Sequence, residues 1–497
     1  MSFGPPPSPY TQSALTAEQN RRRRRNRLLG GLALFGILTL GVSGWFVSSA
    51  GDDSAPAGKT AIRQDPYAIR ETVEKPPTSP EGQRMIDHVV KDLPKGTNKS
   101  RYAPGTWATD KILARGVADR IEGYKIKPEY DEKAWTLKLD GHLCATSRHV
   151  TANGRTAVVV QPAKPENSTT KGVCDEVVFF DLNTGKKLWQ HKMPAADFAY
   201  VTNTNLTLTD GVVAIAWGHG SVAYDMRRGK QLWNSTTTAT CQDQGYAGGR
   251  ALLALVACKQ GENTLYKVQK LDPRTGKPQW TYKVPKGIQA VYLPSSDPPV
   301  LAIAAGDTLV TDLITLDAQG RHLATISLDD YDPKCGDRYS DMSFFGVTEN
   351  CDGVVVGRSQ VYVVSKESIE PNQASDWITA FDLRTGRTAG KFEGRDIQTV
   401  YPLRMSGDEL LIYRQGLYPY ALAALVSWNP HTGKQTPLLF FDLPDDEDTK
   451  LGDPEQTDII VEKGRIFFGR RELARNIAHP DDAVHSAIGF GSVGLKH

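Results

Sequence analysis

The stretch FDLNTGKKLW at residues 180–189 decides the fold, because the same ten-residue phrase returns along the chain. Close copies read YDMRRGKQLW at 224–233 and LDPRTGKPQW at 271–280. The first four aspartates of the series lie 44, 47 and 45 residues apart. A strand–turn–strand repeat with a period near 45 residues predicts a β-propeller. Weaker copies occupy 316–325, 381–390 and 428–437, and an eroded one precedes them all at 124–135.

The chemistry of the phrase is that of a turn. Its glycine supplies the positive φ of a tight hairpin. The aspartate before the turn can accept hydrogen bonds from turn amides. The tryptophan offers a large flat surface that would fill the gap between neighbouring blades. The residues expected to carry these structural roles are Asp181, Gly185, Trp189, Asp225, Gly229, Trp233, Asp272, Gly276, Trp280, Asp382, Gly386 and Gly433.

The number of blades follows from the number of turns. One blade can be read in full at 198–236, with inner strand 211–217, alternating strand 220–226 and outer strand 230–235. Seven turns are complete by residue 442, and 458–473 and 486–491 still hold strand patterns. These strands either form an eighth blade or complete the first one. We therefore expect an all-β propeller of seven or eight four-stranded blades, with eight preferred and with both chain ends contributing to closure.

An uncharged stretch precedes the repeats. Residues 28–50 hold 23 residues without a charge, directly after six arginines at Arg21–Arg25 and Arg27. This length spans a bilayer core as a helix, and the arginines hold its N-terminal end in the cytoplasm. Cleavage after Ser48-Ser49-Ala50 is the alternative, but the stretch is longer than a typical signal-peptide core. We expect a single-pass protein of the cell membrane, with its propeller extracytoplasmic.

The remaining boundaries follow from composition. Residues 1–27 read as a disordered cytoplasmic tail and 51–103 as a linker, and the propeller should fill 104–497. Within the linker, Ser79-Pro80-Glu81 resembles a helix start. A short amphipathic helix is expected there, because apolar residues follow at helical spacing: Met85, Ile86, Val89, Val90 and Leu93.

All six cysteines lie in the part expected to be exported, where disulfides form. Cys241 and Cys258 flank two apolar runs that meet at Gly248-Gly249-Arg250, so a hairpin would place them opposite each other. Sequence proximity then suggests Cys144–Cys174 and Cys335–Cys351. No CxxC occurs, which disfavours a zinc site.

The rest of the sequence gives little chemistry. A net charge of +2 does not favour nucleic acid. The acidic run 442–453 matches no EF-hand, and His479, Asp481, Asp482 and His485 match no zinc motif. Neither a G-x-S-x-G elbow nor a Walker loop is present. No residue is therefore assigned as catalytic, cofactor-binding or metal-binding.

The phrases at 180–189, 224–233 and 271–280 resemble the repeat A-x-D-x-x-T-G-K-x-x-W of the PQQ-like β-propeller superfamily, over roughly residues 104–490. The Arg-rich tail, single span and propeller look like the membrane-anchored actinobacterial members. The superfamily includes quinoprotein dehydrogenases, which bind pyrroloquinoline quinone (PQQ) and Ca²⁺, and non-enzymatic scaffolds. Many of the alcohol-oxidising enzymes carry an adjacent Cys-Cys pair, which this chain lacks.

The resemblance implies the fold more than the activity. We expect a non-catalytic binding or scaffolding module, with no cofactor, for a protein or cell-envelope partner. Its contact loops should be those that stretch the repeat: 328–353, 366–376 and 442–456. The alternative is a PQQ-dependent oxidoreductase that uses Ca²⁺.

Overall fold

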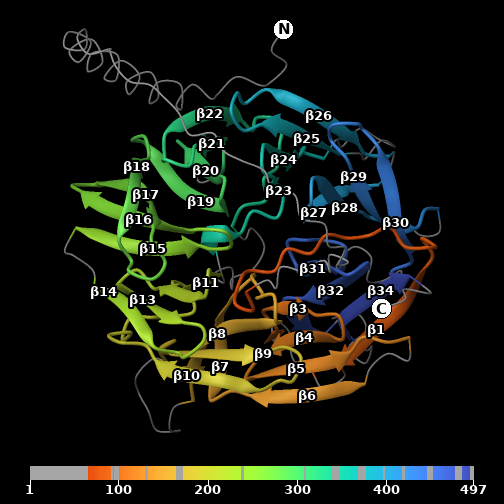
Figure 1. Cartoon of the computed structure of the whole chain (residues 1–497), viewed down its shortest axis with the longest axis horizontal. Helices are drawn as coiled ribbons and strands as arrows, with labels where there is room; N and C mark the ends of the chain where they lie inside the picture. The colour runs from red at the N-terminus through yellow and green to blue at the C-terminus, as the bar shows by residue number, and fades with distance from the viewer. Residues whose placement is uncertain are drawn as a thin grey trace, which may run out of the picture.

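The chain folds into a ring of eight blades in the computed structural model (Figure 1). Each blade is a four-stranded antiparallel sheet. The all-β propeller is confirmed, with eight blades rather than seven. The structure describes residues 65–90, 93, 100–128, 132–163, 172–236, 240–306, 309–336, 347–367, 376–395, 398–416, 420–444, 451–475 and 484–492.

The first four blades each use four consecutive strands, from the channel outward. Blade 1 holds β3 (Thr106–Ala108), β4 (Ile112–Val117), β5 (Arg120–Lys125) and β6 (Lys133–Lys138); blade 2 holds β7 (Gly141–Thr146), β8 (Arg155–Pro162), β9 (Glu176–Asp181) and β10 (Lys187–Lys192); blade 3 holds β11 (Asn205–Thr209), β12 (Val212–Ala216), β13 (Gly220–Asp225) and β14 (Gln231–Thr236); blade 4 holds β15 (Cys241–Ala247), β16 (Leu252–Gln260), β17 (Asn263–Leu271) and β18 (Pro278–Lys283).

The next three blades follow the same rule. Blade 5 holds β19 (Ile288–Ser296), β20 (Pro299–Ala305), β21 (Asp312–Leu316) and β22 (His322–Ser327); blade 6 holds β23 (Val354–Val356), β24 (Gln360–Val364), β25 (Trp377–Asp382) and β26 (Thr388–Glu393); blade 7 holds β27 (Val400–Ser406), β28 (Glu409–Arg414), β29 (Ala423–Trp428) and β30 (Gln435–Phe441).

The eighth blade is built from both ends of the chain. Its inner strands β31 (Thr457–Glu462), β32 (Arg465–Arg470) and β34 (Val484–Ser492) come from the C-terminal part, and its outermost strand is β1 (Gly82–Val90). β1 pairs antiparallel with β34 from Gly82↔Ser492 to Val90↔Val484. A two-stranded sheet of β2 (Ser100–Tyr102) and β33 (Glu472–Ala474) adds a second tie beside it. Closure by the two chain ends is therefore confirmed.

The amphipathic helix expected after Ser79 is wrong, because that segment forms β1. The spacing of the apolar residues suggested a helix, but a strand with two irregularities gives the same burial. Met85 and Ile86 are buried as a helical stripe would be, but β1 carries register shifts at 84/86 and 88/89 that put neighbouring residues on the same side. The edge of β34 also needs a strand, and such pairing overrides local propensity. The propeller thus includes Gly82–Val90, ahead of the boundary at 104.

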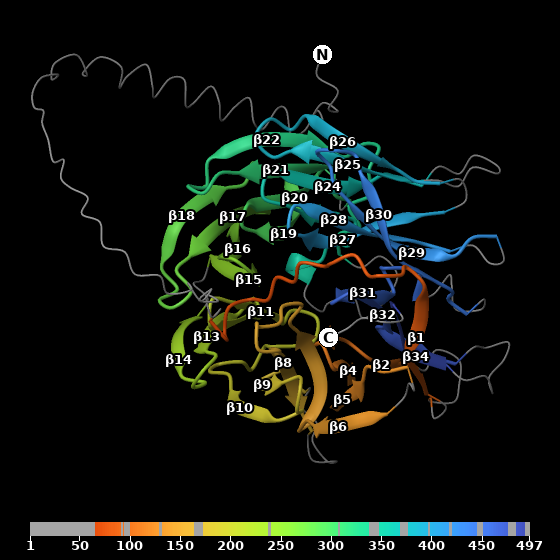
Figure 2. The ribbon, with the colours of Figure 1, turned by 45° about the vertical axis from the view of Figure 1, so that its right-hand side comes forward.

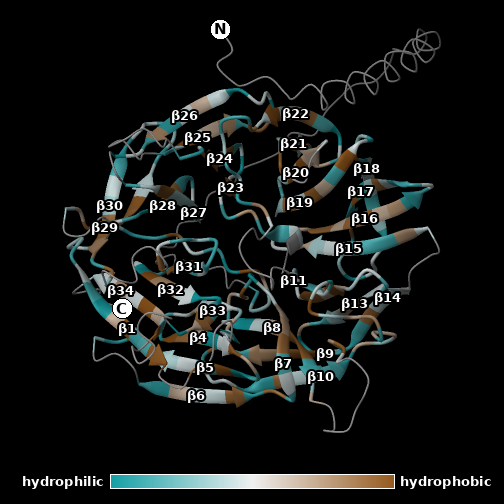
Figure 3. Cartoon of the chain, turned by 180° about the vertical axis from the view of Figure 1, so that it is seen from behind, coloured by the Kyte–Doolittle hydropathy of each residue, from teal (hydrophilic) through white to brown (hydrophobic). Residues whose placement is uncertain are grey.

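The core is a ring of apolar layers between blades. Eight clusters of buried residues each join two neighbouring blades, and the eighth joins blade 8 back to blade 1 through Ile86, Leu113 and Phe467. Strands such as β12 (VVAIA) and β20 (PVLAIAA) are buried throughout because sheets cover both of their faces. Figure 3 shows hydrophobic stretches along the strands and mostly hydrophilic connections.

All three expected disulfides are present: Cys144–Cys174, Cys241–Cys258 and Cys335–Cys351. The second links paired residues of β15 and β16, as the hairpin argument requires. The tail 1–27, the expected membrane segment 28–50 and the linker up to residue 64 lie outside the described residues. Among the residues that are described, the structure contains no helix with the length and apolarity needed to cross a bilayer.

The alternation of strands gives the ring two faces. We call "turn face" the one formed by the connections between the first and second and between the third and fourth strands of each blade. We call "loop face" the opposite one, formed by the connections between the second and third strands and between blades. The repeated Asp–Gly turns lie on the turn face, and loops 328–353, 366–376 and 442–456 belong to the loop face.

Candidate functional site: the central channel

The repeated residues build turns and stand apart from the channel. Asp181 Oδ1 accepts hydrogen bonds from the amides of Asn183 and Thr184, at 2.9 and 3.2 Å. Asp225, Asp272 and Asp382 accept the equivalent pairs of amides. The glycines have φ between +66° and +71°, which only glycine adopts freely. They are Gly185, Gly229, Gly276, Gly386 and Gly433.

The repeated tryptophans link blades 2, 3 and 4 each to the blade that follows. Trp189 Nε1 donates to the carbonyl of Met226 at 2.9 Å, and its ring lies against Gly229, where a Cβ would come within 2.8 Å. Trp233 lies against Gly276, and Trp280 against Gly320, in the same way. At Gly229, Gly276 and Gly320, glycine is therefore required for two reasons: the backbone has a positive φ, and the tryptophan ring leaves no room for a Cβ.

A segment of the chain enters the channel between blades 5 and 6. It begins with the 3₁₀ turn η1 (Val347–Glu349), which Figure 1 shows on the inner side of the ring beside β19 and β15. The bridge between Cys335 and Cys351 anchors its far end. Residues 347–352, which we call the channel segment, belong to loop 328–353, one of the loops expected to contact a partner. This part of the loop instead faces the interior of the ring.

Glu349 holds the channel segment in place. Its Oε1 lies 3.0 Å from His149 Nε2 and accepts hydrogen bonds from the Gly248 amide (2.7 Å) and Thr207 Oγ1 (3.1 Å). These partners come from blades 2, 4 and 3. Burial would raise the pKa of Glu349, but His149 and the other donors outweigh it and leave this pKa below its usual value. The segment is thus fixed by a buried, ionised carboxylate.

A chain of alternating charges continues across the channel. Arg148 Nη2 lies 3.3 Å from one oxygen of Asp352, and Arg471 Nη2 lies 3.2 Å from the other. Arg471 Nε also binds Asp458 Oδ1 at 2.8 Å, and Arg115 lies 4.0 Å from Asp458 Oδ2. Burial would raise the pKa of Asp458, but Arg471 and Arg115 hold it below its usual value. Asp352 therefore ties the channel segment to blades 2 and 8.

The other end of the channel lies under residues 65–81, which we call the strap. Figure 2 shows the strap, in red and orange, crossing the ring from beside β11 to β1. Arg70 donates to the carbonyl of Ala108 at 2.6 Å and lies 3.4 Å from Glu462. Thr72 Oγ1 also binds Glu462, at 3.1 Å from each carboxylate oxygen. The strap therefore lies on the turn face, where it contacts blades 1 and 8.

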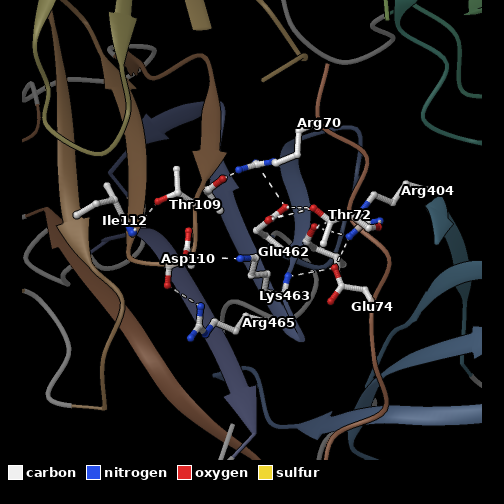
Figure 4. A network of polar contacts seen from close by, with 12 residues as sticks. Arg70, Thr72, Glu74, Thr109, Asp110, Ile112, Arg404, Glu462, Lys463 and Arg465 are labelled. Carbon is white, nitrogen blue, oxygen red and sulfur yellow. Dashed lines mark hydrogen bonds and ion pairs between the residues drawn. The ribbon is translucent and has the colours of Figure 1, made fainter. Parts of the chain in front are cut away.

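Glu74 is the tightest point of the strap (Figure 4). Its side chain is 2 % exposed and pairs with Arg404 of blade 7. Its carboxylate also accepts the amides of Lys463 (3.1 Å) and Gly464 (2.5 Å) of blade 8. In the other direction, the Glu74 amide donates to Ser406 Oγ at 2.8 Å. Because Glu74 contacts two blades, it fastens the strap to the ring.

Two cavities remain in the channel, of about 280 and 480 Å³. The smaller borders Arg148, Asp352 and Arg471, and the larger lies beneath the strap. Among the described residues, no group of three His, Cys, Asp or Glu side chains could hold a metal ion. A quinone with several carboxylates needs cations in excess, whereas Arg148 and Arg471 already pair with aspartates. The described residues that border the smaller cavity therefore do not fit PQQ with Ca²⁺.

The three long loops meet on the loop face, on the side of blades 5 to 8. The Lys366 amide donates to the carbonyl of Asp330 at 3.0 Å, which joins loop 366–376 to loop 328–353. Lys334 Nζ lies 2.7 Å from Glu455 Oε1, which joins loop 442–456. Burial would lower the pKa of Lys334, but Glu455 and Asp332 raise it above its usual value. The described parts of the loops thus form one fastened surface.

Sequence reasoning found the turns but missed the channel. Arg148, Glu349 and Arg471 belong to no motif, and their partners come from blades far apart in the sequence. The one usable signal was the pair Cys335 and Cys351, because their bridge ties the channel segment back to the start of its loop.

Comparison with known proteins identifies the family. A family model described as outer membrane protein assembly factor BamB, of the PQQ-like repeat type, matches residues 103–252 and, in an overlapping match, 173–436. The chain belongs to this BamB-type family of PQQ-like propellers. No curated protein sequence matches it.

Several solved structures resemble this BamB-type propeller. BamB from Moraxella catarrhalis has 12% identity and a TM-score of 0.44, covering 84% of this chain and 99% of that chain. Quinohemoprotein alcohol dehydrogenase from Comamonas testosteroni has 11% identity and a TM-score of 0.44, covering 84% and 78%. The corresponding enzyme ADHIIG from Pseudomonas putida HK5 has 12% identity and a TM-score of 0.44, covering 80% and 76%. These likenesses concern the fold and carry no argument about activity.

Proposed function

We propose that this protein is a membrane-anchored, extracytoplasmic propeller that acts as a non-catalytic binding or scaffolding module for a protein or cell-envelope partner. Residues 28–50 anchor it, with the N-terminus in the cytoplasm. Family membership is compatible with this role, because the family model takes its description from an assembly factor. The loop face binds the partner.

The proposal depends mainly on one observation, namely that the protein's own residues occupy and cover the central channel. A central channel is where a propeller can enclose a small ligand. Here the channel segment lies inside it, held by Glu349 and Asp352, and the strap crosses its turn-face end. Opening the channel would take the buried carboxylates of Glu349 and Asp352 away from partners on several blades, which is costly. The outer surfaces are therefore the better place for a contact.

The loop face has the character of a protein-binding surface. Four of the most exposed large apolar side chains among the described residues lie on its connections, whereas single apolar residues elsewhere are ordinary. They are Phe198, Leu309, Tyr420 and Leu422, with Tyr420 84 % exposed. Exposed aromatic residues beside charged loops are typical of protein interfaces.

Two measurements test the proposal on the full chain, one in detergent and one in native membranes. Titration with PQQ and Ca²⁺ should leave the melting temperature unchanged, and a saturable rise would favour the oxidoreductase instead. A photo-crosslinking residue in place of Tyr420 should capture a defined partner in native membranes. The same residue in place of His431 on the turn face is the control. Identical products from both positions would contradict binding by the loop face.

A further inference from the structure

The repeated turns of blades 2 to 7, which lie on the turn face, carry an excess of basic residues. The phrases at 181–187, 225–230, 272–277, 317–321, 382–387 and 429–434 hold 11 basic and 5 acidic residues. The acids are the turn aspartates, which point back to the turn amides. Two of the cations, Arg274 and Arg321, pair with the turn aspartates Asp225 and Asp317. The others include four exposed ones for which the structure records no ion pair among the described residues: Arg228, Lys277, Arg384 and Arg387. Because the blades repeat around the ring, the cations repeat around the turn face as well.

The loop face carries the opposite charge. Outside the channel segment, loops 328–353, 366–376 and 442–456 together hold 15 acidic and 4 basic residues, in a chain of net charge +2. Their described parts include Asp329 and Asp330, which are exposed, and Asp332, which is partly exposed. The protein therefore has a basic face and an acidic one, separated by the height of the blades.

The chain emerges from the basic face. The strap begins at Asp65, and the guanidinium groups of Arg155 and Arg227 lie 5.0 and 5.2 Å from the Tyr67 ring. Tyr67 thus fixes the start of the strap beside the Asp225 turn of blade 3. Only residues 51–64 separate this point from the hydrophobic stretch 28–50. Fourteen residues span at most ~50 Å when fully extended. A membrane that holds residues 28–50 therefore lies within reach of the turn face.

We propose that the turn face lies against the anionic lipid headgroups of the membrane in which residues 28–50 are anchored. This inference rests on the membrane anchor of the proposed function and adds an orientation to it. Each exposed cation near an anionic bilayer is attracted to it, and the attraction falls off within a Debye length. The acidic loop face is repelled by the same surface. The propeller consequently presents its long loops and exposed aromatic residues away from the membrane.

The test compares the distance of the two faces from a bilayer. The full chain is placed in phosphatidylcholine vesicles with or without phosphatidylglycerol, and the lipids carry an energy-transfer acceptor. A donor dye is attached at His431→Cys on the turn face or at Glu262→Cys on the loop face. Both positions are exposed, and all six native cysteines are in disulfides. Transfer from position 431 should exceed transfer from position 262 several-fold in anionic vesicles, and high salt should reduce the difference.

Charge reversal provides the matched control. Changing Arg228, Lys277, Arg384 and Arg387 to Glu should abolish the difference between the two labels. The control changes four exposed lysines at the loop-face ends of the blades to Glu, which alters the net charge equally and should keep the difference. They are Lys138, Lys259, Lys283 and Lys286.

The outcomes separate the orientation from the anchor. Equal transfer from the two labels in anionic vesicles, with the chain floating together with the lipid, refutes the orientation alone. A chain that does not float with the vesicles refutes the anchor, and the orientation with it. The same effect from both sets of charge reversals also refutes the orientation, because it would trace the difference to net charge rather than to the turn face.

Discussion

Replacing Glu74 by Gln should loosen the strap at its tightest point. The carboxylate is 2 % exposed and receives Arg404 Nη2 and the amides of Lys463 and Gly464. Gln keeps one acceptor oxygen, but it removes the charge and turns a donor toward these amides. Breaking a buried ion pair costs about 3–5 kcal/mol. Arg404 keeps its bonds to backbone carbonyls, so we expect the lower end, about 3 kcal/mol.

Glu71→Gln in the same strap is the matched control. Glu71 pairs with Arg250 at 2.5 Å, but their side chains are 50 % and 38 % exposed. An exposed pair contributes about 0–1 kcal/mol. Urea unfolding followed by tryptophan fluorescence gives the change in stability, and hydrogen exchange of residues 65–81 gives the local loosening. The reasoning fails if the two variants differ by less than about 1 kcal/mol and exchange equally.

Three further predictions concern other parts of the ring. Gly229→Ala should lower the melting temperature more than Gly433→Ala: both glycines have positive φ, but a Cβ at 229 meets the Trp189 ring, whereas at 433 it meets open space. Burial raises the pKa of Asp376 to about 7, so between about pH 4 and 7 the carboxyl is ionised in the unfolded chain but still protonated in the folded one, and stability falls as the pH rises through this range. Asp376→Asn should flatten that pH profile of unfolding, and an unchanged profile would contradict the assignment. Replacing both Cys335 and Cys351 by Ala should speed hydrogen exchange in residues 347–352 without unfolding the ring, and full protection would show that ion pairs alone hold the channel segment.

The sequence predicted those parts of the fold that repeat. The spacing of Asp181, Asp225 and Asp272 indicated blades, because each blade needs the same turn. Cys241 and Cys258 could be paired, because a hairpin relates them locally. These inferences depended on short stretches of chain, where spacing and structure are directly linked.

The parts that depend on distant pairing could not be predicted. The segment around Met85 and Ile86 satisfied a helical pattern, and only the open edge of β34, formed about 400 residues later, makes it a strand. Glu349 gave no signal, because its partners at 149, 207 and 248 become neighbours only when the ring is closed. A single sequence without such contacts leaves the channel segment indistinguishable from an exposed loop.

The shared eighth blade has a consequence for how the protein is made. The strand at residues 82–90 leaves the ribosome about 400 residues before its partner at 484–492. Until residues 484–492 are made, the outer strand β1 has no partner strand, and an unpaired strand edge is a template for aggregation. A chain that stops before residue 484 can stack seven blades but cannot complete the circle. The pairing of β1 with β34 therefore delays closure of the ring until synthesis has passed residue 492.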